Sequence, residues 1–234
     1  MNQGQTMELI NNVDHLLGDN LKTELRKGSK VSIAASCFSI YAYEALMEEL
    51  NGVEEVRFVF TSPTFITDQI KKEKREFYIP RLNRERSLYG SEFEIRLKNE
   101  LTLKAIAREC GDWIRRKVTF KSNRTNGSMQ GMIHIQNGRE SVSYAPIDGF
   151  TTVDLGYERG NALSKIVHKI TEAPFTQEYL NLFNQLWNDK DKLEDVTQQV
   201  LDHITTVYQE NSPEFIYFVI LYNIFSEFLS DITE

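Results

Sequence analysis

The first sixty residues alternate between helical and extended patterns of apolar side chains. Residues 5–27 repeat leucine, isoleucine and valine at helical spacing, which predicts a helix that Gly28 ends. The segment 30–38, KVSIAASCF, is apolar and partly β-branched, as expected of a buried strand. An amphipathic helix at 39–50 and a second strand at 54–62 follow. Strand, helix and strand within about thirty residues predict a βαβ unit in a parallel sheet that is buried on both faces.

The middle of the chain predicts a charged excursion, a long helix and three strands. Residues 66–88 are dominated by charge and read as an exposed helical segment. Residues 92–117 predict one long helix whose basic last turn suits the negative end of the helix dipole. Strands are expected at 118–123, 131–137 and 141–147, and the last two are joined by a tight GRE turn into a hairpin.

The pattern changes near residue 174, after which we expect three helices and no strands, at 176–188, 193–209 and 213–232. The last is apolar on most sides and needs covering. Two explanations stay open: a terminal helix buried in its own domain, or the first part of a longer protein that ends here at a domain boundary. The expected architecture is an α/β domain at 1–173, a mixed sheet sandwiched by helices, followed by an all-helical connector at 174–234.

Composition narrows the class of protein. The 234 residues have the apolar content of a folded chain and a net charge of -7, which argues against a uniformly basic nucleic-acid coat. The two cysteines have no CxxC neighbour, and no set of Cys and His has zinc-ligand spacing, so no metal site is expected. The N-terminus lacks the features of a signal peptide, and no apolar run is long enough for a membrane span. We expect a cytoplasmic protein that contacts no membrane.

Local charge departs from the average in two places. One basic stretch, interleaved with Phe77 and Tyr78, carries seven positive charges against three glutamates: Lys71, Lys72, Lys74, Arg75, Arg81, Arg84 and Arg86. A second cluster leads into the predicted hairpin: Arg115, Arg116, Lys117, Lys121 and Arg124. A solvated helix face is one interpretation, and contact with the phosphates of DNA or RNA is the other.

The strand GMIHIQN contains His134, which is either a structural histidine or a nucleophile. The order of elements, with PIDGFTTVDLG following the hairpin, resembles the phospholipase D-like superfamily. In that family a histidine on an H-x-K strand attacks phosphorus without a metal, and a lysine on the same strand face neutralises the phosphoryl charge. The resemblance assigns His134 as nucleophile, but Gln136 stands at the lysine position and Asp148 replaces a polar residue of the GSxNFT-type turn. These departures predict the fold with a degenerate catalytic motif.

Nearly the whole chain resembles the phospholipase D-like domains that precede the motor of bacterial superfamily-two helicases of the Swi/Snf type. The resemblance is most specific at 146–161 and 212–234. It implies a non-motor accessory domain whose partners are the motor of the same chain and DNA or RNA. No GxxxxGK[ST] or GxGxxG motif occurs, so no cofactor is expected in these residues.

Two alternatives stay open. In the first, the chain is a metal-independent phosphodiesterase or nuclease, in which two His134 residues face each other across a homodimer and a basic side chain such as Lys121 or Arg139 supplies the missing charge. In the second, the domain is a protein-interaction module that touches no nucleic acid.

Overall fold

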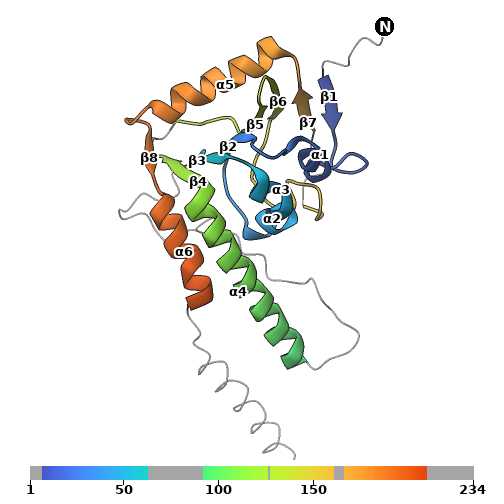
Figure 1. The fold of residues 1–234 in the computed structure, drawn as a ribbon, viewed down its shortest axis with the longest axis vertical. Coiled ribbons are helices and arrows are strands. Elements are labelled where there is room, and N and C mark those ends of the chain that lie inside the picture. The colour runs from blue at the N-terminus through green and yellow to red at the C-terminus, as the bar shows by residue number, and fades with distance from the viewer. Residues whose placement is uncertain (1–6, 63–91, 126, 161–165, 210–234) are drawn as a thin grey trace, which may run out of the picture.

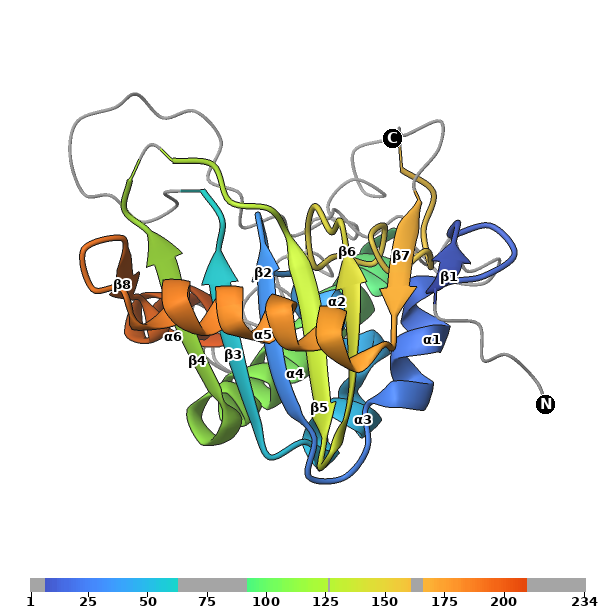
Figure 2. The same ribbon diagram turned by 90° about the horizontal axis from the view of Figure 1, so that it is seen from above.

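The protein folds around one mixed eight-stranded sheet with helices on both faces (Figures 1 and 2). The computed structural model describes residues 7–62, 92–125, 127–160 and 166–209. The strands lie in the order β1-β7-β6-β5-β2-β3-β4-β8. Their bounds are β1 Met7–Ile10, β2 Lys30–Ala35, β3 Glu55–Phe60, β4 Val118–Asn123, β5 Met132–Asn137, β6 Glu140–Ala145, β7 Val167–Ile170 and β8 Leu193–Asp195.

Two layers of helices cover the sheet. Figure 2 shows α5 crossing one face, while the other helices lie behind the sheet. The bounds are α1 Leu17–Glu24, α2 Ile40–Ala45, α3 Met47–Gly52, α4 Glu92–Lys117, α5 Ala173–Asn188 and α6 Thr197–Gln209. The long helix α4 packs against α2 and α6. The expected α/β architecture with a mixed sheet between helices is therefore confirmed.

The centre of the sheet follows the prediction closely. The strands β2, β3 and β4 are parallel, and β2 with β3 forms the expected βαβ unit through α2 and α3. The Ser39 side chain accepts a hydrogen bond from the backbone N–H of Tyr41 and so caps the start of α2. The strands β5 and β6 form the predicted antiparallel hairpin.

The prediction of one helix over residues 5–27 is wrong. Residues 7–10 form the edge strand β1, which pairs with β7, and α1 begins only at Leu17. The Asn11 side chain accepts hydrogen bonds from the backbone N–H groups of the three residues that follow Asn12. Asn12 itself has a φ of 54°, in the left-handed region. Asparagine stabilises such a turn with its own amide, and this local chemistry overrides the helical spacing of the apolar residues.

The expectation of helices alone after residue 174 is also wrong. The short strand β8 pairs antiparallel with β4 and extends the sheet, so the described part of this region is not all-helical. Helix α5 begins at Ala173, with a proline in its first turn. It contacts β5, β6 and β8, and α6 packs on α4 and β4. The domain boundary at residue 173 stays a prediction, and the predicted helix at 213–232 lies outside the described residues.

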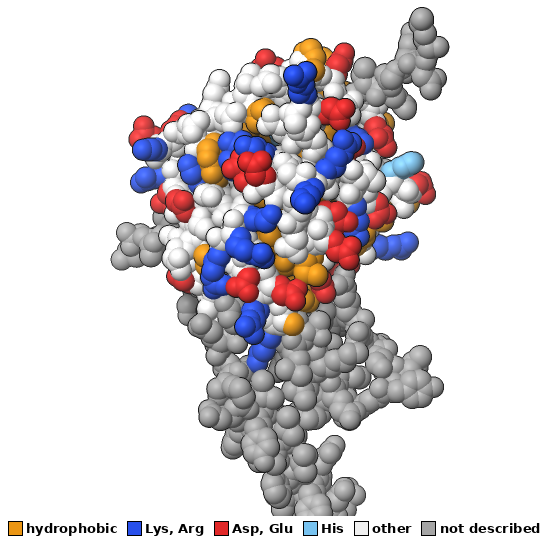
Figure 3. All heavy atoms as spheres, viewed as in Figure 1, with side chains coloured by type: hydrophobic (Ala, Val, Ile, Leu, Met, Phe, Trp, Pro, Cys, Tyr) orange, Lys and Arg blue, Asp and Glu red, His pale blue; other side chains and the backbone are white. Residues whose placement is uncertain are grey.

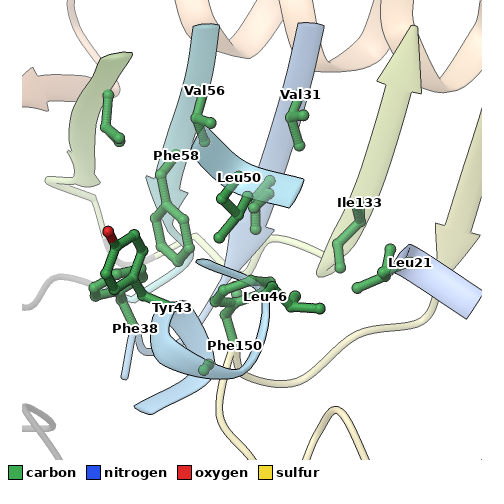
Figure 4. Packing of buried hydrophobic residues seen from close by; sticks show 14 of the residues in the cluster. Leu21, Val31, Phe38, Tyr43, Leu46, Leu50, Val56, Phe58, Ile133 and Phe150 are labelled. Atoms are coloured by element: carbon green, nitrogen blue, oxygen red, sulfur yellow. The ribbon is translucent and has the colours of Figure 1, made fainter. Parts of the chain in front are cut away.

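The main core lies between the sheet and α1–α4 with α6 (Figure 4). Its centre is aromatic, with the rings of Phe38 and Phe58 in contact with each other and with those of Phe120 and Phe150. A smaller apolar cluster lies on the α5 face and consists of Ala34, Val59, Met132, Ala145, Phe183 and Leu193. The α5 face is therefore only partly apolar, and its remaining positions form the candidate site.

Candidate functional site

Four polar side chains form one row across four neighbouring strands on the face that α5 covers. Arg57 of β3 is the register partner of Ser32 on β2, Ser32 is the partner of His134 on β5, and His134 is the partner of Ser143 on β6. Directly opposed residues of adjacent strands point to the same face. The register alone therefore assembles a polar row from residues that lie far apart in the sequence.

Hydrogen bonds join the members of this row in pairs. The His134 Nδ1 atom lies 2.9 Å from the Ser143 hydroxyl oxygen. The Arg57 guanidinium donates from Nη2 to the Ser32 hydroxyl at 2.9 Å and from Nη1 to the Asn184 amide oxygen of α5, also at 2.9 Å. Arg57 thereby links the polar row to the helix above it.

His134 is enclosed, with 1% of its surface exposed. Its Nε2 atom is buried and has no hydrogen-bond partner among the residues that the structure describes. Burial, followed by the positive charge of Arg57, lowers the pKa of His134 to about 4. The imidazole is therefore neutral near pH 7, the form a nucleophile needs, but it has no open path to a phosphodiester.

Helix α5 closes the site with aromatic side chains. The Arg57 guanidinium carbon lies 5.1 Å from the centre of the Phe183 ring and 5.7 Å from that of Trp187. These two rings stack on each other. On the next strand, the Lys121 ammonium donates to the Trp187 carbonyl at 2.8 Å and lies 4.5 Å from the centre of its ring. Two cations from the sheet therefore hold the C-terminal half of α5.

The other two residues assigned by the motif lie apart from this enclosed row. Gln136 is two residues beyond His134 on the same strand face, pairs with Ser141 in the register, and is partly exposed. Asp148 is exposed, and its carbonyl accepts a hydrogen bond from the backbone N–H of Ser36 at the end of β2. The structure thus places His134 and Gln136 on one face and Asp148 at the carboxyl edge of the parallel strands.

The turn that contains Asp148 is tightly built. Phe150 pairs with the segment after β2, where its N–H donates to the Cys37 carbonyl. A Cβ atom at Gly149 would lie 2.5 Å from the Asp154 carboxylate and 2.7 Å from the Cys37 sulfur. Asp154 in turn accepts hydrogen bonds from the backbone and hydroxyl of Thr151. Packing and hydrogen bonding within this turn therefore explain the GFT sequence without a bound ligand.

The basic residues expected to contact nucleic acid do not form one described patch. Arg115 and Arg116 are exposed at the end of α4, and each hydrogen-bonds to Asp112. Arg124 is exposed at the other end of β4, about 17 Å away along a six-residue strand. Lys121 is occupied by Trp187 as described above. The first basic group, Lys71, Lys72, Lys74 and Arg75, lies outside the described residues.

The visible surface has mixed charge. On the face shown in Figure 3, basic and acidic side chains are interspersed over the described residues. Within the same part of the chain, no group of three or more His, Cys, Asp or Glu residues is placed to hold a metal ion. None of the helices described there combines the length and apolar composition needed to cross a bilayer.

Four residues of the site were not predicted from the sequence: Arg57, Ser32, Ser143 and Asn184. A signal for Arg57 was present, because EVRFVF places a charge inside an otherwise apolar strand. A buried charge requires partners, and that requirement points to polar residues on neighbouring strands. Asn184 had no such signal, since it lies on a helix whose position over the sheet depends on tertiary packing.

No family model matches this sequence, and no curated protein matches it significantly. Solved structures give distant similarities. Nuc, a phospholipase D family member from Salmonella typhimurium, aligns with a TM-score of 0.43 and 13% identity over 81% of this chain and 96% of its own. Phosphatidylserine synthase of Haemophilus influenzae aligns with a TM-score of 0.44 and 11% identity over 89% of this chain and 44% of its own. TrmBL2, an archaeal chromatin protein with a novel mode of DNA binding, aligns with a TM-score of 0.35 and 10% identity over 78% of this chain and 52% of its own.

Proposed function

We propose that this chain is a catalytically inactive, phospholipase D-like accessory domain that binds nucleic acid next to the motor of a DNA helicase or translocase. We infer that the domain is inactive mainly because His134 is enclosed beneath α5, with 1% of its surface exposed. An attacking imidazole must approach phosphorus in line at about 3–3.5 Å, and a buried Nε2 atom has no room for such an approach.

The charge around His134 supports the same assignment. A phosphodiesterase needs a cation aimed at the phosphoryl oxygens, and Gln136 supplies none. Arg57 is cationic, but its guanidinium is engaged by Ser32 and Asn184 and lies over two aromatic rings. Arg57 therefore serves the packing of α5 rather than an incoming phosphate.

In the dimeric alternative, His134 would be covered by α5 in both chains. Two facing His134 residues would require both chains to remove α5 from the sheet. That movement would break the hydrogen bonds from Arg57 to Asn184 and from Lys121 to Trp187 in each chain. An active phosphodiesterase thus remains the second candidate, and the experiment below separates it from the first.

Nucleic-acid binding rests on charge and chain connectivity. The stretch 71–86 concentrates positive charge in a chain of net charge -7. It follows β3 in the chain, and β3 ends at Phe60 on the carboxyl edge of the parallel strands. Arg124 is exposed at the same edge. We assign phosphate contact to Lys71, Lys72, Lys74, Arg75 and Arg124, and leave the motor partner as an inference from sequence resemblance.

The test is a paired binding and cleavage assay on labelled single- and double-stranded DNA with EDTA present. We expect no cleavage by the wild type or His134→Gln, and binding that weakens steeply between about 50 and 200 mM salt. The double variant Lys71→Ala/Lys72→Ala should reduce the salt slope on single strands by about 1.4, which is about 0.7 for each lost phosphate contact. The matched control Lys27→Ala/Arg139→Ala removes the same charge from the other edge of the sheet and should leave the slope unchanged.

Two results would overturn the proposal in different ways. Cleavage by the wild type that disappears in His134→Gln would establish the phosphodiesterase. Absence of binding at every salt concentration, with a correctly folded chain, would favour the protein-interaction module.

A further inference from the structure

A pocket of about 370 Å³ opens at the carboxyl ends of β2, β3 and β4. Ala34, Val59 and Met132 form its floor, and Phe183 and Leu186 of α5 form one wall. The segment between β4 and β5 passes over the strand ends (Figure 2). Its residues 127–130 also line the pocket. In open α/β sheets this edge is where ligands usually bind, and the volume lies within the range of small-ligand sites.

The pocket is separate from the row that contains His134. Ala34 lies two residues after Ser32 on β2, and Met132 lies two residues before His134 on β5. The pocket and the polar row therefore lie on the same face of the sheet, about 7 Å apart along the strands. None of the four residues of the polar row lines the pocket. Its chemistry is consequently independent of the degenerate motif.

The lining divides into an apolar interior and a polar rim. The interior contains the Phe183 ring and two methionines, Met129 and Met132, whose flexible thioethers adapt to flat ligands. At the rim lie Ser128 and Gln130, both exposed. Within the described ranges neither side chain has a hydrogen-bond partner, so the amide of Gln130 offers both a donor and an acceptor. An apolar slot with an amide at its mouth fits a flat ring that carries polar atoms on its edge.

Cations flank the mouth. Arg124 is exposed, and its backbone N–H donates to the Lys192 carbonyl at 2.9 Å. Lys192 lines the pocket, but its ammonium is shared with Asp189 at 2.8 Å. Arg124 stands between the lining residues Asn123 and Thr125, so its exposed side chain brings a positive charge close to the opening.

We propose that this pocket binds one unstacked nucleobase of a single-stranded nucleic acid, with the adjoining phosphate held by Arg124. The proposal rests on the nucleic-acid-binding function above and adds its substrate class, an unpaired strand. A base in a duplex cannot enter, because its faces are stacked and its edge is paired. Apolar and aromatic contact with the base faces, together with Gln130 at the base edge, is the usual chemistry of single-strand recognition.

The experiment compares four labelled probes of equal length: single-stranded DNA, single-stranded RNA of the same sequence, duplex DNA, and a single strand of abasic sites. Ala34→Leu fills the floor of the pocket, and Gln130→Ala removes the rim amide. Gln199→Ala on the exposed face of α6 is the matched control. Urea midpoints verify folding, and Gln130→Ala keeps the test decisive if Ala34→Leu fails to fold.

We expect the wild type to bind the base-containing single strands roughly tenfold or more tightly than the abasic strand. Each pocket variant should lose most of that difference while its salt slope stays unchanged, and the control should behave as wild type. The DNA and RNA arms identify which sugar is preferred. Equal binding of normal and abasic strands, or pocket variants that bind like wild type, would overturn the pocket and leave salt-dependent binding intact. Absence of binding to all four probes would overturn both proposals.

Discussion

The imidazole of His134 and the hydroxyl of Ser143 lie directly opposite each other on β5 and β6, with Nδ1 and Oγ 2.9 Å apart. This contact satisfies one ring nitrogen, whereas the buried Nε2 atom is left without a partner among the described residues. A second proton on the ring would place a positive charge in the same enclosure as the Arg57 guanidinium. The burial of His134 and the nearby charge of Arg57 therefore both favour the neutral imidazole.

The first prediction is a stability loss at acidic pH caused by His134. Its pKa in the folded state, about 4, lies below the ordinary value of 6.5. The unfolded chain therefore takes up a proton first as the pH falls, and stability present above pH 6.5 is lost towards pH 4. We expect His134 to contribute a loss of about 2 kcal/mol in the free energy of unfolding between about pH 7 and pH 5.

Urea unfolding at the two pH values measures this loss. His134→Gln should flatten the dependence. The matched variant Met132→Ala, which removes a buried neighbour that does not titrate, should lower stability at both pH values by a similar amount. An unchanged pH dependence in His134→Gln would show that the ring is accessible to protons in the folded state.

The second prediction concerns Arg57→Met. Burial is the larger cause of the lowered pKa of His134 and the charge of Arg57 is the second, so removing the guanidinium should raise that pKa from about 4 part of the way towards 6.5. Stability near pH 7 should fall by about 1–3 kcal/mol, because Ser32 and Asn184 lose a charged donor. NMR titration of the imidazole and urea unfolding measure the two effects.

The control for this variant is Arg26→Met. Arg26 is largely exposed and contacts Glu24 and Glu140 at the surface, so its loss should cost less than about 1 kcal/mol. A His134 pKa that does not move in Arg57→Met would mean that burial alone sets it.

The sequence predicted the elements that combine length with a clear pattern. The six-residue strands β2–β6 and the helix α4 were placed within a few residues. The strands β1, β7 and β8 were not found, since segments of three or four residues show too little periodicity to distinguish strand from helix. Their pairing also joins distant positions, as Met7 with Ile170.

The candidate site was also predicted only in part, because the strand pattern placed its residues but did not show which helix covers them. The sequence placed His134 on a strand and Gln136 on the same strand face, and both follow from the period of two. Whether His134 is open or covered could not be read from the strand. That outcome depends on where α5 packs, and α5 is held by contacts from Arg57 and Lys121 on two other strands.

The third prediction is a graded response to alanine at three glycines. A Cβ at Gly131 would clash with the Ile147 carbonyl oxygen, a backbone atom that is held in place because the Ile147 N–H donates to the Gly131 carbonyl. At Gly149 the nearest atoms belong to the side chains of Asp154 and Cys37. At Gly52 the nearest is the Lys27 Cα at 3.7 Å, an ordinary contact.

Gly131→Ala should therefore be the most destabilising of the three, by more than about 3 kcal/mol. Gly149→Ala should cost about 1–3 kcal/mol, because the carboxylate that caps Thr151 must shift. Gly52→Ala should be within about 1 kcal/mol of wild type. Urea midpoints give the order, and a Gly131→Ala variant as stable as Gly52→Ala would contradict the close approach at β5.

The last prediction separates Lys121 from the basic residues proposed to bind phosphate. Its ammonium donates to the Trp187 carbonyl near the C-terminal end of α5 and lies over the Trp187 ring. A positive charge at this end of a helix is stabilised by the helix dipole. Lys121→Met should lower the free energy of unfolding by about 1 kcal/mol and change the tryptophan fluorescence.

Trp187 is the reporter, because the second tryptophan, Trp113, is buried in the main core on the other side of the sheet. The salt slope of DNA binding should stay at the wild-type value in Lys121→Met, since a cation that holds α5 neutralises no phosphate and so releases no counterion from the DNA. Arg124→Met, which removes an exposed cation from the end of the same strand, should reduce the slope by about 0.7 on single strands. A matching reduction in Lys121→Met would show that α5 leaves the sheet when nucleic acid binds and frees Lys121 for phosphate.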